Sequence, residues 1–337
     1  MNPLSAIYGG VVWARNAFYD RGALRANRLE GPVISVGNLS TGGSGKTPFI
    51  LLLGELLQAR GIRFDVLSRG YGRKTRGVLL VDPAGLPQQF GDEPLLIARK
   101  LQVPVVVAED RHAAGRYAEA ELAEAKLTEA KPAEAKRAEK TSAQLHLLDD
   151  GFQHRALARD FDIVLVTPQD ATDRLLPSGR LREPLASLRR ADAVVLASGA
   201  AADSFAIQDK LVWRVRRGLA LENLPRPVPP RPVVFCGIAR PQNFVLQLRA
   251  ANVDPAAEAF YRDHHAYSEQ DIRELLALKR QSEAGGFVTT EKDAVNLGPY
   301  LSALEPLAVV PVKMQLQDAA NAVDTMLHKI EERKRRA

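Results

Sequence analysis

The sequence predicts an α/β protein with a P-loop NTPase-type parallel sheet flanked by helices, and a smaller C-terminal α/β lobe. Three observations support this prediction. Short apolar runs alternate with helical stretches, which is typical of βαβ units. A glycine-rich loop ending in Gly45-Lys46-Thr47 lies between the first apolar run and a helix. A proline-rich stretch, "NLPRPVPPRPV", separates this region from a second α/β pattern.

The predicted elements follow in chain order. "GPVISVGNL" is typical of a buried strand, and "PFILLLGELLQARG" of a helix that ends at a glycine. The later strands are predicted in "IRFDVLSRG", "GVLLVD", "VPVVVAED", "LHLLDD" and "FDIVLVT". Beyond a linker at 220–232, "VVFCGIARPQNFVLQL" is predicted to start a second α/β unit, with a strand in "GGFVTT" and a C-terminal helix. The predicted divisions are an N-terminal helical region at 1–28, a P-loop core at 29–222 and a C-terminal lobe at 223–337.

Composition limits the class of protein. The 337 residues carry a net charge of +6, which suits an anionic partner such as a nucleotide, nucleic acid or acidic membrane face. The single cysteine, Cys236, excludes an intramolecular disulfide and fits a reducing compartment. No apolar run reaches transmembrane length and no signal peptide is evident. These features predict a soluble cytoplasmic protein.

The N-terminal stretch permits two interpretations. Its apolar residues Ile7, Val11, Ala14 and Phe18 share one helical face. Three arginines follow at helical spacing: Arg21, Arg25 and Arg28. Such a helix either lies in a membrane interface or packs against its own domain, and the pattern alone favours packing. A different segment, 118–143, repeats Glu-Ala-Lys without an apolar stripe, so we predict a solvated spacer with no catalytic role.

The glycine-rich loop departs from the common P-loop pattern, because Ser40 stands where that pattern has its first glycine. Three later glycines supply the curvature that lets backbone N–H groups face phosphate oxygens. Lys46 is positioned to reach the β- and γ-phosphates, and the Thr47 hydroxyl to bind Mg²⁺. The predicted phosphate-binding residues are Thr41, Gly42, Gly43, Ser44, Gly45, Lys46, Thr47 and Pro48.

A second acidic contributor to a metal site is predicted at the end of "LHLLDD", where Asp149 and Asp150 follow an apolar strand. Asp149 is also compatible with a turn or helix cap. Further polar candidates lie in motifs that each have a structural interpretation as well: "SRGYGR", "GDEP", "LREP", "DHHAY" and "TTEKDAV". The histidines show no zinc-type spacing.

The chain resembles the tetraacyldisaccharide 4′-kinases of lipid A biosynthesis. The resemblance is carried by the order along the chain of these motifs together with "SVGNLSTGGSGKTP", "LLDDGFQH" and "CGIARPQNF". The resemblance spans the chain apart from the Glu-Ala-Lys segment. It implies transfer of phosphate from ATP, with Mg²⁺, to the 4′-hydroxyl of a lipid A disaccharide 1-phosphate. It also implies a peripheral enzyme at the cytoplasmic face of the bacterial inner membrane. The N-terminal helix would dock on the anionic membrane surface, which reverses the preference for packing.

The resemblance also implies roles for individual residues. Asp92 would accept the hydroxyl proton, oriented by His264 from the second lobe, while Lys46 stabilises the charge of the transferred group. Glu93 and His265 are the neighbouring rivals, which the sequence does not separate. Mg²⁺ would be held by Thr47 and one or both of Asp149 and Asp150, with Glu183 a weaker candidate. Arg69 and Arg73 would bind either the substrate phosphate or the γ-phosphate.

Two other functions share some features of this sequence. A P-loop ATPase of the partitioning or metallocluster-carrier type also has two glycines before Gly-Lys-Thr, but such proteins carry a lysine where this chain has Thr41. A basic nucleic-acid-binding protein would need an aromatic-interleaved basic stripe or a helix-turn-helix pattern, and neither is evident. We therefore expect no nucleic-acid partner.

Overall fold

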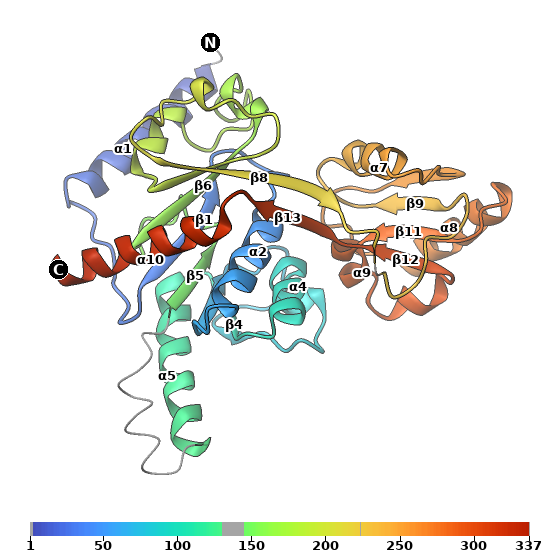
Figure 1. The fold of residues 1–337 in the computed structure, drawn as a ribbon, viewed down its shortest axis with the longest axis horizontal. Helices are drawn as coiled ribbons and strands as arrows, with labels where there is room; N and C mark the ends of the chain where they lie inside the picture. The colour runs from blue at the N-terminus through green and yellow to red at the C-terminus, as the bar shows by residue number, and fades with distance from the viewer. Residues whose placement is uncertain (1–2, 130–144, 223, 337) are drawn as a thin grey trace.

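The protein has two lobes, each built on its own sheet (Figure 1). This computed structural model describes residues 3–129, 145–222 and 224–336. The nine strands of the larger sheet lie in the order β13-β8-β7-β6-β1-β5-β2-β4-β3. Their bounds are β1 (Val33–Asn38), β2 (Phe64–Ser68), β3 (Leu79–Leu80), β4 (Val105–Val107), β5 (Leu145–Asp149), β6 (Phe161–Val166), β7 (Ala193–Leu196), β8 (Leu211–Leu219) and β13 (Val312–Leu316).

The larger sheet is parallel from β8 to β4, and its two edge strands, β13 and β3, pair antiparallel. Successive residues of the central strands face opposite sides. On β6, for example, Ile163 packs in one core cluster and Val164 in another. Strands buried on both faces have continuous apolar sequence, which is why these runs were recognisable. The predicted strand in "GVLLVD" is reduced to the short edge strand β3.

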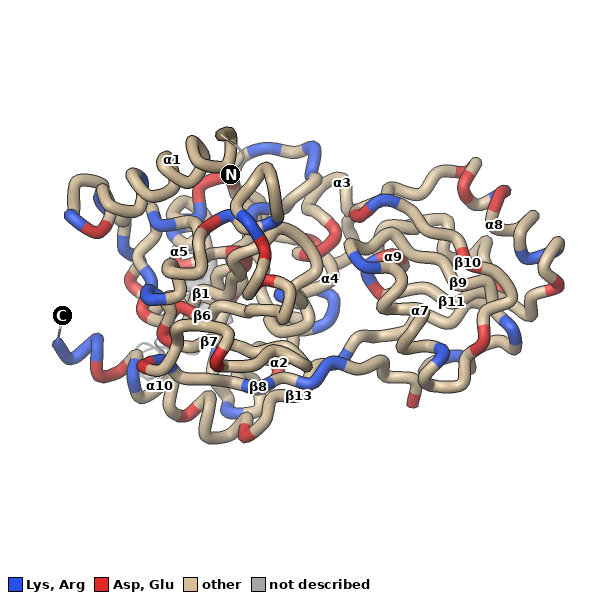
Figure 2. The backbone as a smooth tube through the Cα atoms, turned by 90° about the horizontal axis from the view of Figure 1, so that it is seen from above, with Lys and Arg blue, Asp and Glu red and all other residues tan. Residues whose placement is uncertain are grey.

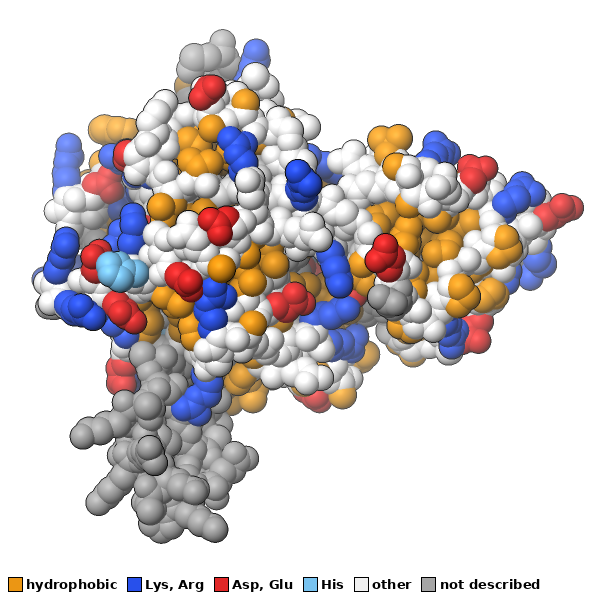
Figure 3. All heavy atoms as spheres, in the orientation of Figure 1, with side chains coloured by type: hydrophobic (Ala, Val, Ile, Leu, Met, Phe, Trp, Pro, Cys, Tyr) orange, Lys and Arg blue, Asp and Glu red, His pale blue; other side chains and the backbone are white. Residues whose placement is uncertain are grey.

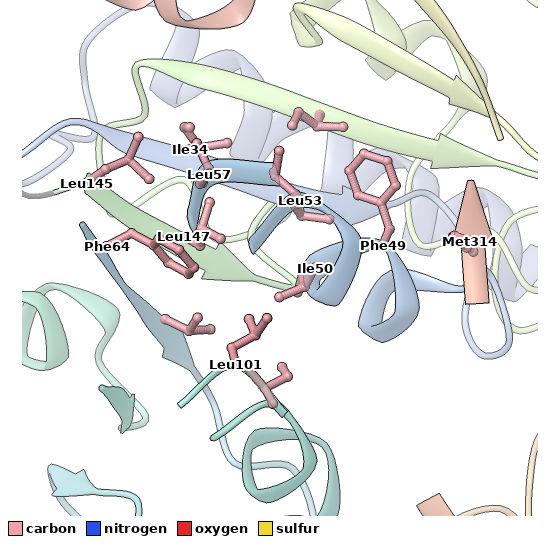
Figure 4. Close-up of a cluster of buried hydrophobic side chains, with 14 of the residues drawn as sticks. Ile34, Phe49, Ile50, Leu53, Leu57, Phe64, Leu101, Leu145, Leu147 and Met314 are labelled. Carbon is pink, nitrogen blue, oxygen red and sulfur yellow. The ribbon is translucent and has the colours of Figure 1, made fainter. Parts of the chain in front are cut away.

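Helices cover both faces of this sheet. Their bounds are α1 (Pro3–Asp20), α2 (Lys46–Gln58), α3 (Pro87–Phe90), α4 (Asp92–Leu101), α5 (Arg111–Glu129) and α10 (Ala319–Arg336). Figure 4 shows α2 laying Phe49, Ile50 and Leu53 against Ile34 of β1 and Leu147 of β5, all of them fully buried. This packing fixes the start of α2 next to the end of β1. The Glu-Ala-Lys segment lies outside the described residues from position 130 to 143.

The smaller lobe is a four-stranded parallel sheet in the order β10-β9-β11-β12. Its elements are β9 (Val233–Cys236), α7 (Pro241–Ala250), β10 (Ala257–Phe260), α8 (Glu269–Gln281), β11 (Phe287–Thr290), α9 (Glu291–Leu297) and β12 (Leu307–Val310). α8 begins at a capped end, where the Ser268 hydroxyl accepts a hydrogen bond from the Asp271 N–H. The predicted linker lies between β8 and β9.

The end of the chain differs from the predicted division at 223–337. After β12 the chain returns to the larger lobe, where β13 pairs with β8 and α10 packs against the core (Figure 1). α10 buries Val323, Met326 and Ile330, whose spacing forms one helical stripe. This stripe requires an apolar partner, which the face of the large sheet beside α2 provides. Residues 312–336 therefore belong structurally to the larger lobe.

Charged residues of both signs are interspersed over the two lobes (Figures 2 and 3). The end of α10 is a local exception, because Arg333, Lys334, Arg335 and Arg336 follow one another there. The net charge of +6 is thus spread over the molecule.

Candidate active site

The predicted P-loop connects β1 to α2, and its backbone has the required curvature. Gly42, Gly43 and Gly45 have φ of 73°, 52° and 86°, in the left-handed region that disfavours side chains. Gly45 also faces the Met314 side chain from β13 so closely that an added Cβ would collide with it. The loop therefore opens directly onto the N-terminus of α2, whose N–H groups and dipole favour a phosphate.

Lys46 lies between the loop and the two predicted aspartates. Its Nζ donates to Asn38 Oδ1 (3.1 Å) and is 3.4 Å from Asp150 Oδ1. Arg182 Nη1 donates to the other Asp150 oxygen (2.7 Å). Burial alone would raise the pKa of Asp150, but the charges of Lys46 and Arg182 hold that pKa below its ordinary value. Asp150 is therefore a carboxylate at neutral pH.

Asp149, its neighbour, makes no ion pair with any described residue, and the more distant charge of Lys46 only partly favours its ionised form. Ser68 Oγ donates to Asp149 Oδ2 (2.8 Å), while the buried Oδ1 has no hydrogen-bond partner among the described residues. Burial, with the negative charges of Glu93 and Asp150, raises the pKa of Asp149 to about 7. An unpartnered oxygen on a destabilised carboxylate is suited to a cation, which would favour the ionised form.

These groups fit a Mg²⁺ site that is shared with water and substrate better than a metal site whose ligands all come from the protein. Mg²⁺ usually takes one or two carboxylates and completes its shell with water and substrate phosphates. Asp149, Asp150 and the Thr47 hydroxyl line one cavity with the P-loop. Within the described ranges, no group of three or more His, Cys, Asp or Glu side chains is placed to hold a metal. A nucleotide would therefore have to supply part of the metal shell.

The structure brings Asp92 and His264 into contact across the two lobes. Asp92 is the first residue of α4, and His264 follows β10 in the smaller lobe. His264 Nδ1 is 3.0 and 2.8 Å from the two Asp92 oxygens. The Glu93 N–H (2.9 Å) and Asn296 Nδ2 (3.1 Å) also donate to this carboxylate. The pair lies 172 residues apart in sequence.

Electrostatics favour the ionised form of Asp92. Burial would raise the pKa of Asp92, but the His264 hydrogen bond and the Lys292 charge lower it. For His264, burial favours the neutral form, yet the contact with Asp92 raises its pKa. Lys292 Nζ lies 3.2 Å from His264 Nε2 and donates to Asp263 Oδ1 (2.9 Å). Asp92 is therefore ionised at neutral pH and lies in the cavity wall.

The two alternative candidates, His265 and Glu93, lie in different surroundings. His265 turns away into the smaller lobe, where its Nε2 is 3.1 Å from Asp271 Oδ2 and its ring stacks on Tyr261. Glu93 lines the cavity with Asp92, and its Oε1 is 3.6 Å from Lys292 Nζ. Geometry thus selects His264 over His265 as the partner of Asp92. Glu93 is therefore placed to contact a ligand.

The structure places Glu183 away from the predicted metal site. Its carboxylate is fully buried and accepts hydrogen bonds from Arg190 Nη1 (2.9 Å), Asn16 Nδ2 (2.9 Å) and Arg15 Nη2 (3.3 Å). Because these donors already surround it and it does not line the cavity, Glu183 is not placed to bind the metal. Its sequence motif, "LREP", gave no indication that α1 would supply two of these donors.

The two predicted phosphate-binding arginines also separate. Arg69 lines the cavity, whereas Arg73 is turned toward Glu109 and the Gly77 carbonyl. Two functional neighbours went unpredicted, Asn38 beside Lys46 and Asn296 beside Asp92. Asn38 ends the strand before the P-loop, and Asn296 lies one helical turn after Lys292. Each asparagine could have been identified in the sequence from this position relative to a predicted site residue.

A single cavity of about 1120 Å³ joins these groups. Its walls come from both lobes: the P-loop, Asp92 and Asp149 from the larger, His264 and Lys292 from the smaller. A phosphate donor bound at the P-loop and an acceptor at Asp92 would therefore share one space.

Comparison with known proteins gives a consistent result. A family model described as tetraacyldisaccharide-1-P 4′-kinase matches residues 1–331. The chain is 48% identical to tetraacyldisaccharide 4′-kinase of Koribacter versatilis over 99% of each protein. It is 36% identical to the enzyme of that name from Geobacter metallireducens, over 97% of this chain and 96% of the relative. A crystal structure of LpxK from Aquifex aeolicus in complex with ATP is similar, with TM-score 0.74, 33% identity and 97% of both chains covered.

Proposed function

We propose, because this chain belongs to the tetraacyldisaccharide-1-P 4′-kinase family, that it transfers the γ-phosphate of ATP to the 4′-hydroxyl of a tetraacyldisaccharide 1-phosphate, a lipid A precursor. The observation that carries this proposal is the Asp92–His264 contact in the cavity that also holds the P-loop. A simple ATPase has no need of a second base-like group facing an acceptor space. The whole-length family match likewise favours the kinase over an ATPase of the partitioning or carrier type.

The chain's own residues divide the work of phosphoryl transfer. The loop at 41–48 holds the nucleotide phosphates, and Lys46 neutralises charge that develops on the transferred group. Thr47, Asp149 and Asp150 would hold Mg²⁺, which when bound neutralises phosphate charge. Asp92 accepts the proton of the attacking hydroxyl, and His264 fixes the direction of the carboxylate. Because such transition states are loose, orientation of the hydroxyl matters more than a strongly basic carboxylate.

Both lobes are needed to complete this arrangement. His264 and Lys292 reach Asp92 only because the smaller lobe lies over the mouth of the P-loop. We infer that this arrangement limits the entry of water, which would otherwise compete with the lipid hydroxyl for the phosphate.

We further propose that α1 docks the enzyme on a membrane. Polar contacts hold one side of α1 to the protein, including Tyr8 Oη to the Arg182 carbonyl (3.0 Å) and Asn16 Nδ2 to Glu183. The side chains that face outward are apolar and each more than half exposed: Leu4, Ile7, Val11, Trp13 and Phe18. An acceptor whose acyl chains lie in the bilayer resists extraction at about 0.8 kcal/mol per CH₂, so the enzyme has to reach the surface.

The proposed location is the cytoplasmic face of the bacterial inner membrane, as a peripheral protein. Arg21 and Arg25 follow the apolar face of α1 and are exposed, which suits an anionic leaflet. Among the helices of the described ranges, none has the length and apolar character to cross a bilayer.

The kinase proposal is tested by following the label of [γ-³²P]ATP into a tetraacyldisaccharide 1-phosphate in detergent micelles. We expect Asp92→Asn to lower kcat by about 10²–10⁴-fold, because the proton acceptor is lost. His264→Ala should lower kcat less, and the double variant should resemble Asp92→Asn alone, since the two residues act as a unit. ATP affinity should be unchanged in all three.

The matched control is His265→Ala, which removes the neighbouring imidazole without touching Asp92. It should retain kcat within a few-fold. Lipid-independent ATP hydrolysis by the wild-type enzyme, with no labelled lipid, would contradict the proposed function and favour the ATPase.

A further inference from the structure

Three nitrogen-bearing side chains line the part of the cavity beyond the aspartates. Arg69 directly follows β2, Arg111 opens α5 after β4, and His154 follows β5. β5, β2 and β4 are neighbours in the sheet and all parallel. Because the carboxyl ends of parallel strands meet at one edge, these three residues gather at one end of the cavity.

The positive charge of this cluster is not balanced by an ion pair. Arg111 is only 6% exposed, and its Nη1 donates to the carbonyls of Glu109 (2.9 Å) and Ala108 (3.4 Å). Its Nε finds no hydrogen-bond partner in the described part of the chain. Among the residues that the structure describes, no carboxylate is within ion-pair distance of Arg69 or Arg111. A buried charge without a partner is costly, so such a site favours an anion.

The acidic residues nearest in sequence are already engaged. Glu109 accepts from Arg73 Nη2 (2.7 Å), and Asp110 caps α5 by accepting from the His112 N–H (2.9 Å). Burial and the neighbouring charge of Arg69 lower the pKa of Arg111, against the opposing charges of Asp149, Asp150 and Asp110. Burial and the charge of Arg111 lower the pKa of His154 to about 4, so its ring is neutral at pH 7 and retains one N–H donor. An anion would relieve the repulsion between the two arginines.

The cluster is displaced from the P-loop along the sheet edge. The P-loop follows β1, and β2 and β4 lie two and three strands away from it. At about 4.8 Å per strand, this displacement is roughly 10–14 Å. A nucleotide phosphate held by Lys46 would not reach that far, whereas an acceptor of two linked sugar rings has its hydroxyl and its phosphate at opposite ends.

We propose that Arg69, Arg111 and His154 form a subsite for the phosphate monoester of the acceptor. The two guanidinium groups would bind its oxygens through charge-assisted hydrogen bonds, and the His154 N–H would add a third donor. Binding the 1-phosphate there would orient the other end of the disaccharide toward Asp92. This inference rests on the proposed kinase function and names the feature of the acceptor that the cavity recognises.

The test compares two acceptors that differ only in the 1-phosphate. We expect Arg69→Gln to lower kcat/KM for the 1-phosphorylated disaccharide by about 10–100-fold, the range for a lost charged hydrogen bond. For the disaccharide without the phosphate, the same variant should change kcat/KM less than about twofold, because no partner is lost. The KM for ATP should stay unchanged. Arg111→Lys, which keeps the charge but loses the planar fork, should lose less than Arg111→Gln.

The matched control is Arg76→Gln, an exposed arginine of the same loop that does not line the cavity. Equal losses of Arg69→Gln on both acceptors, or a raised KM for ATP, would overturn the subsite. If wild type labels neither acceptor, the kinase proposal fails. Calorimetric binding of the 1-phosphorylated disaccharide without ATP then decides the subsite separately. Weaker binding to Arg69→Gln than to wild type supports it, and equal binding refutes it.

Discussion

Adjacent aspartates at the end of β5 show how local charge sets the role of a residue. Asp150 faces Lys46 and Arg182, which keep its pKa low. Asp149 is more deeply buried, accepts a hydrogen bond from the Ser68 hydroxyl, and has its pKa raised to about 7. The same residue type in consecutive positions therefore provides one ion-paired carboxylate and one whose ionised form a bound cation would stabilise further.

Glu183 should act on stability instead of metal binding. Glu183→Ala removes the carboxylate that pairs with the largely buried Arg190, leaving a buried charge unpaired. We expect a loss of about 3–5 kcal/mol in the free energy of unfolding, measured by urea denaturation. The Mg²⁺ concentration for half-maximal activity, measured at a temperature where the variant is folded, should match wild type. A large rise in that concentration would restore Glu183 to the metal shell.

At the scale of elements, α1 is joined to the active site by its contacts at 182–183. Tyr8 donates to the carbonyl of Arg182, whose guanidinium pairs with Asp150. The helix proposed to meet the membrane is therefore packed against the segment that contacts Asp150 of the proposed metal site.

The outward face of α1 gives an element-scale prediction. Replacing Ile7 and Trp13 together by Glu should greatly reduce co-sedimentation with vesicles containing anionic phospholipid, because both side chains are more than 60% exposed. Transfer to a detergent-solubilised acceptor should change much less. The control is Leu246→Glu on α7, with a similar exposure of 60%, which should bind vesicles like wild type. Unchanged vesicle binding of the α1 variant would refute docking through this face.

A buried ionic cluster ties β5 to its neighbours at the opposite end of the sheet. His146 Nδ1 is 2.9 Å from Asp65 on β2, and its Nε2 is 3.4 Å from Glu119 on α5, an ion-pair separation without an aligned hydrogen bond. Burial opposes the charged ring, but Asp65 and Glu119 raise the pKa of His146 above 6.5. The folded state therefore keeps a proton that the unfolded chain releases.

The sign of this shift predicts how stability depends on pH. The stabilisation from His146 is fully present below pH 6.5 and is lost as pH rises through the higher folded-state pKa. His146→Gln should therefore reduce the unfolding free energy by about 3–5 kcal/mol near pH 6, and the difference from wild type should narrow toward pH 9. His328→Gln, on the exposed face of α10, is the control and should change stability by less than about 0.5 kcal/mol. A difference that widens with pH would contradict the shift.

At the scale of the whole molecule, the returning C-terminal segment joins the two lobes into one structure. β8 leads out of the larger lobe and β13 leads back beside it, with Val312 opposite Leu219 (Figure 1). Met314 of β13 packs on Gly45 of the P-loop. The path of the chain thus places the smaller lobe beside the nucleotide site and the last strand against it.

Deleting residues 312–337 should unfold the larger lobe as well. The deletion removes five buried apolar side chains and exposes the core that they cover: Met314, Leu316, Val323, Met326 and Ile330. At about 1.5–3 kcal/mol each, roughly 7–15 kcal/mol is lost, comparable to the entire stability of a domain. Circular dichroism should show no cooperative melting. Removing only 334–337, which are exposed where described, should leave Tm nearly unchanged. A folded larger lobe in the 1–311 protein would support the division at 223 predicted from sequence.

Local patterns predicted much of this molecule. The strands around β1 are continuous apolar runs because both sheet faces are buried, and the P-loop is visible because its glycines and Lys46 are consecutive in sequence. The family, ATP as substrate and the kinase activity follow from such motifs and agree with the comparisons. The roles of individual site residues, Mg²⁺ and membrane docking stay predictions.

The amino-acid sequence was sufficient for features made by neighbours along the chain: the strand–loop–helix of the P-loop, the acidic pair after β5 and the apolar face of α1. Tertiary structure alone decided which of two adjacent histidines meets Asp92, that Glu183 supports α1, and that residues 312–336 rejoin the larger lobe. These outcomes depend on contacts between segments far apart in sequence. Which of these contacts form depends on how the apolar faces are buried and the charges paired when the lobes pack together. No local sequence pattern encodes that result.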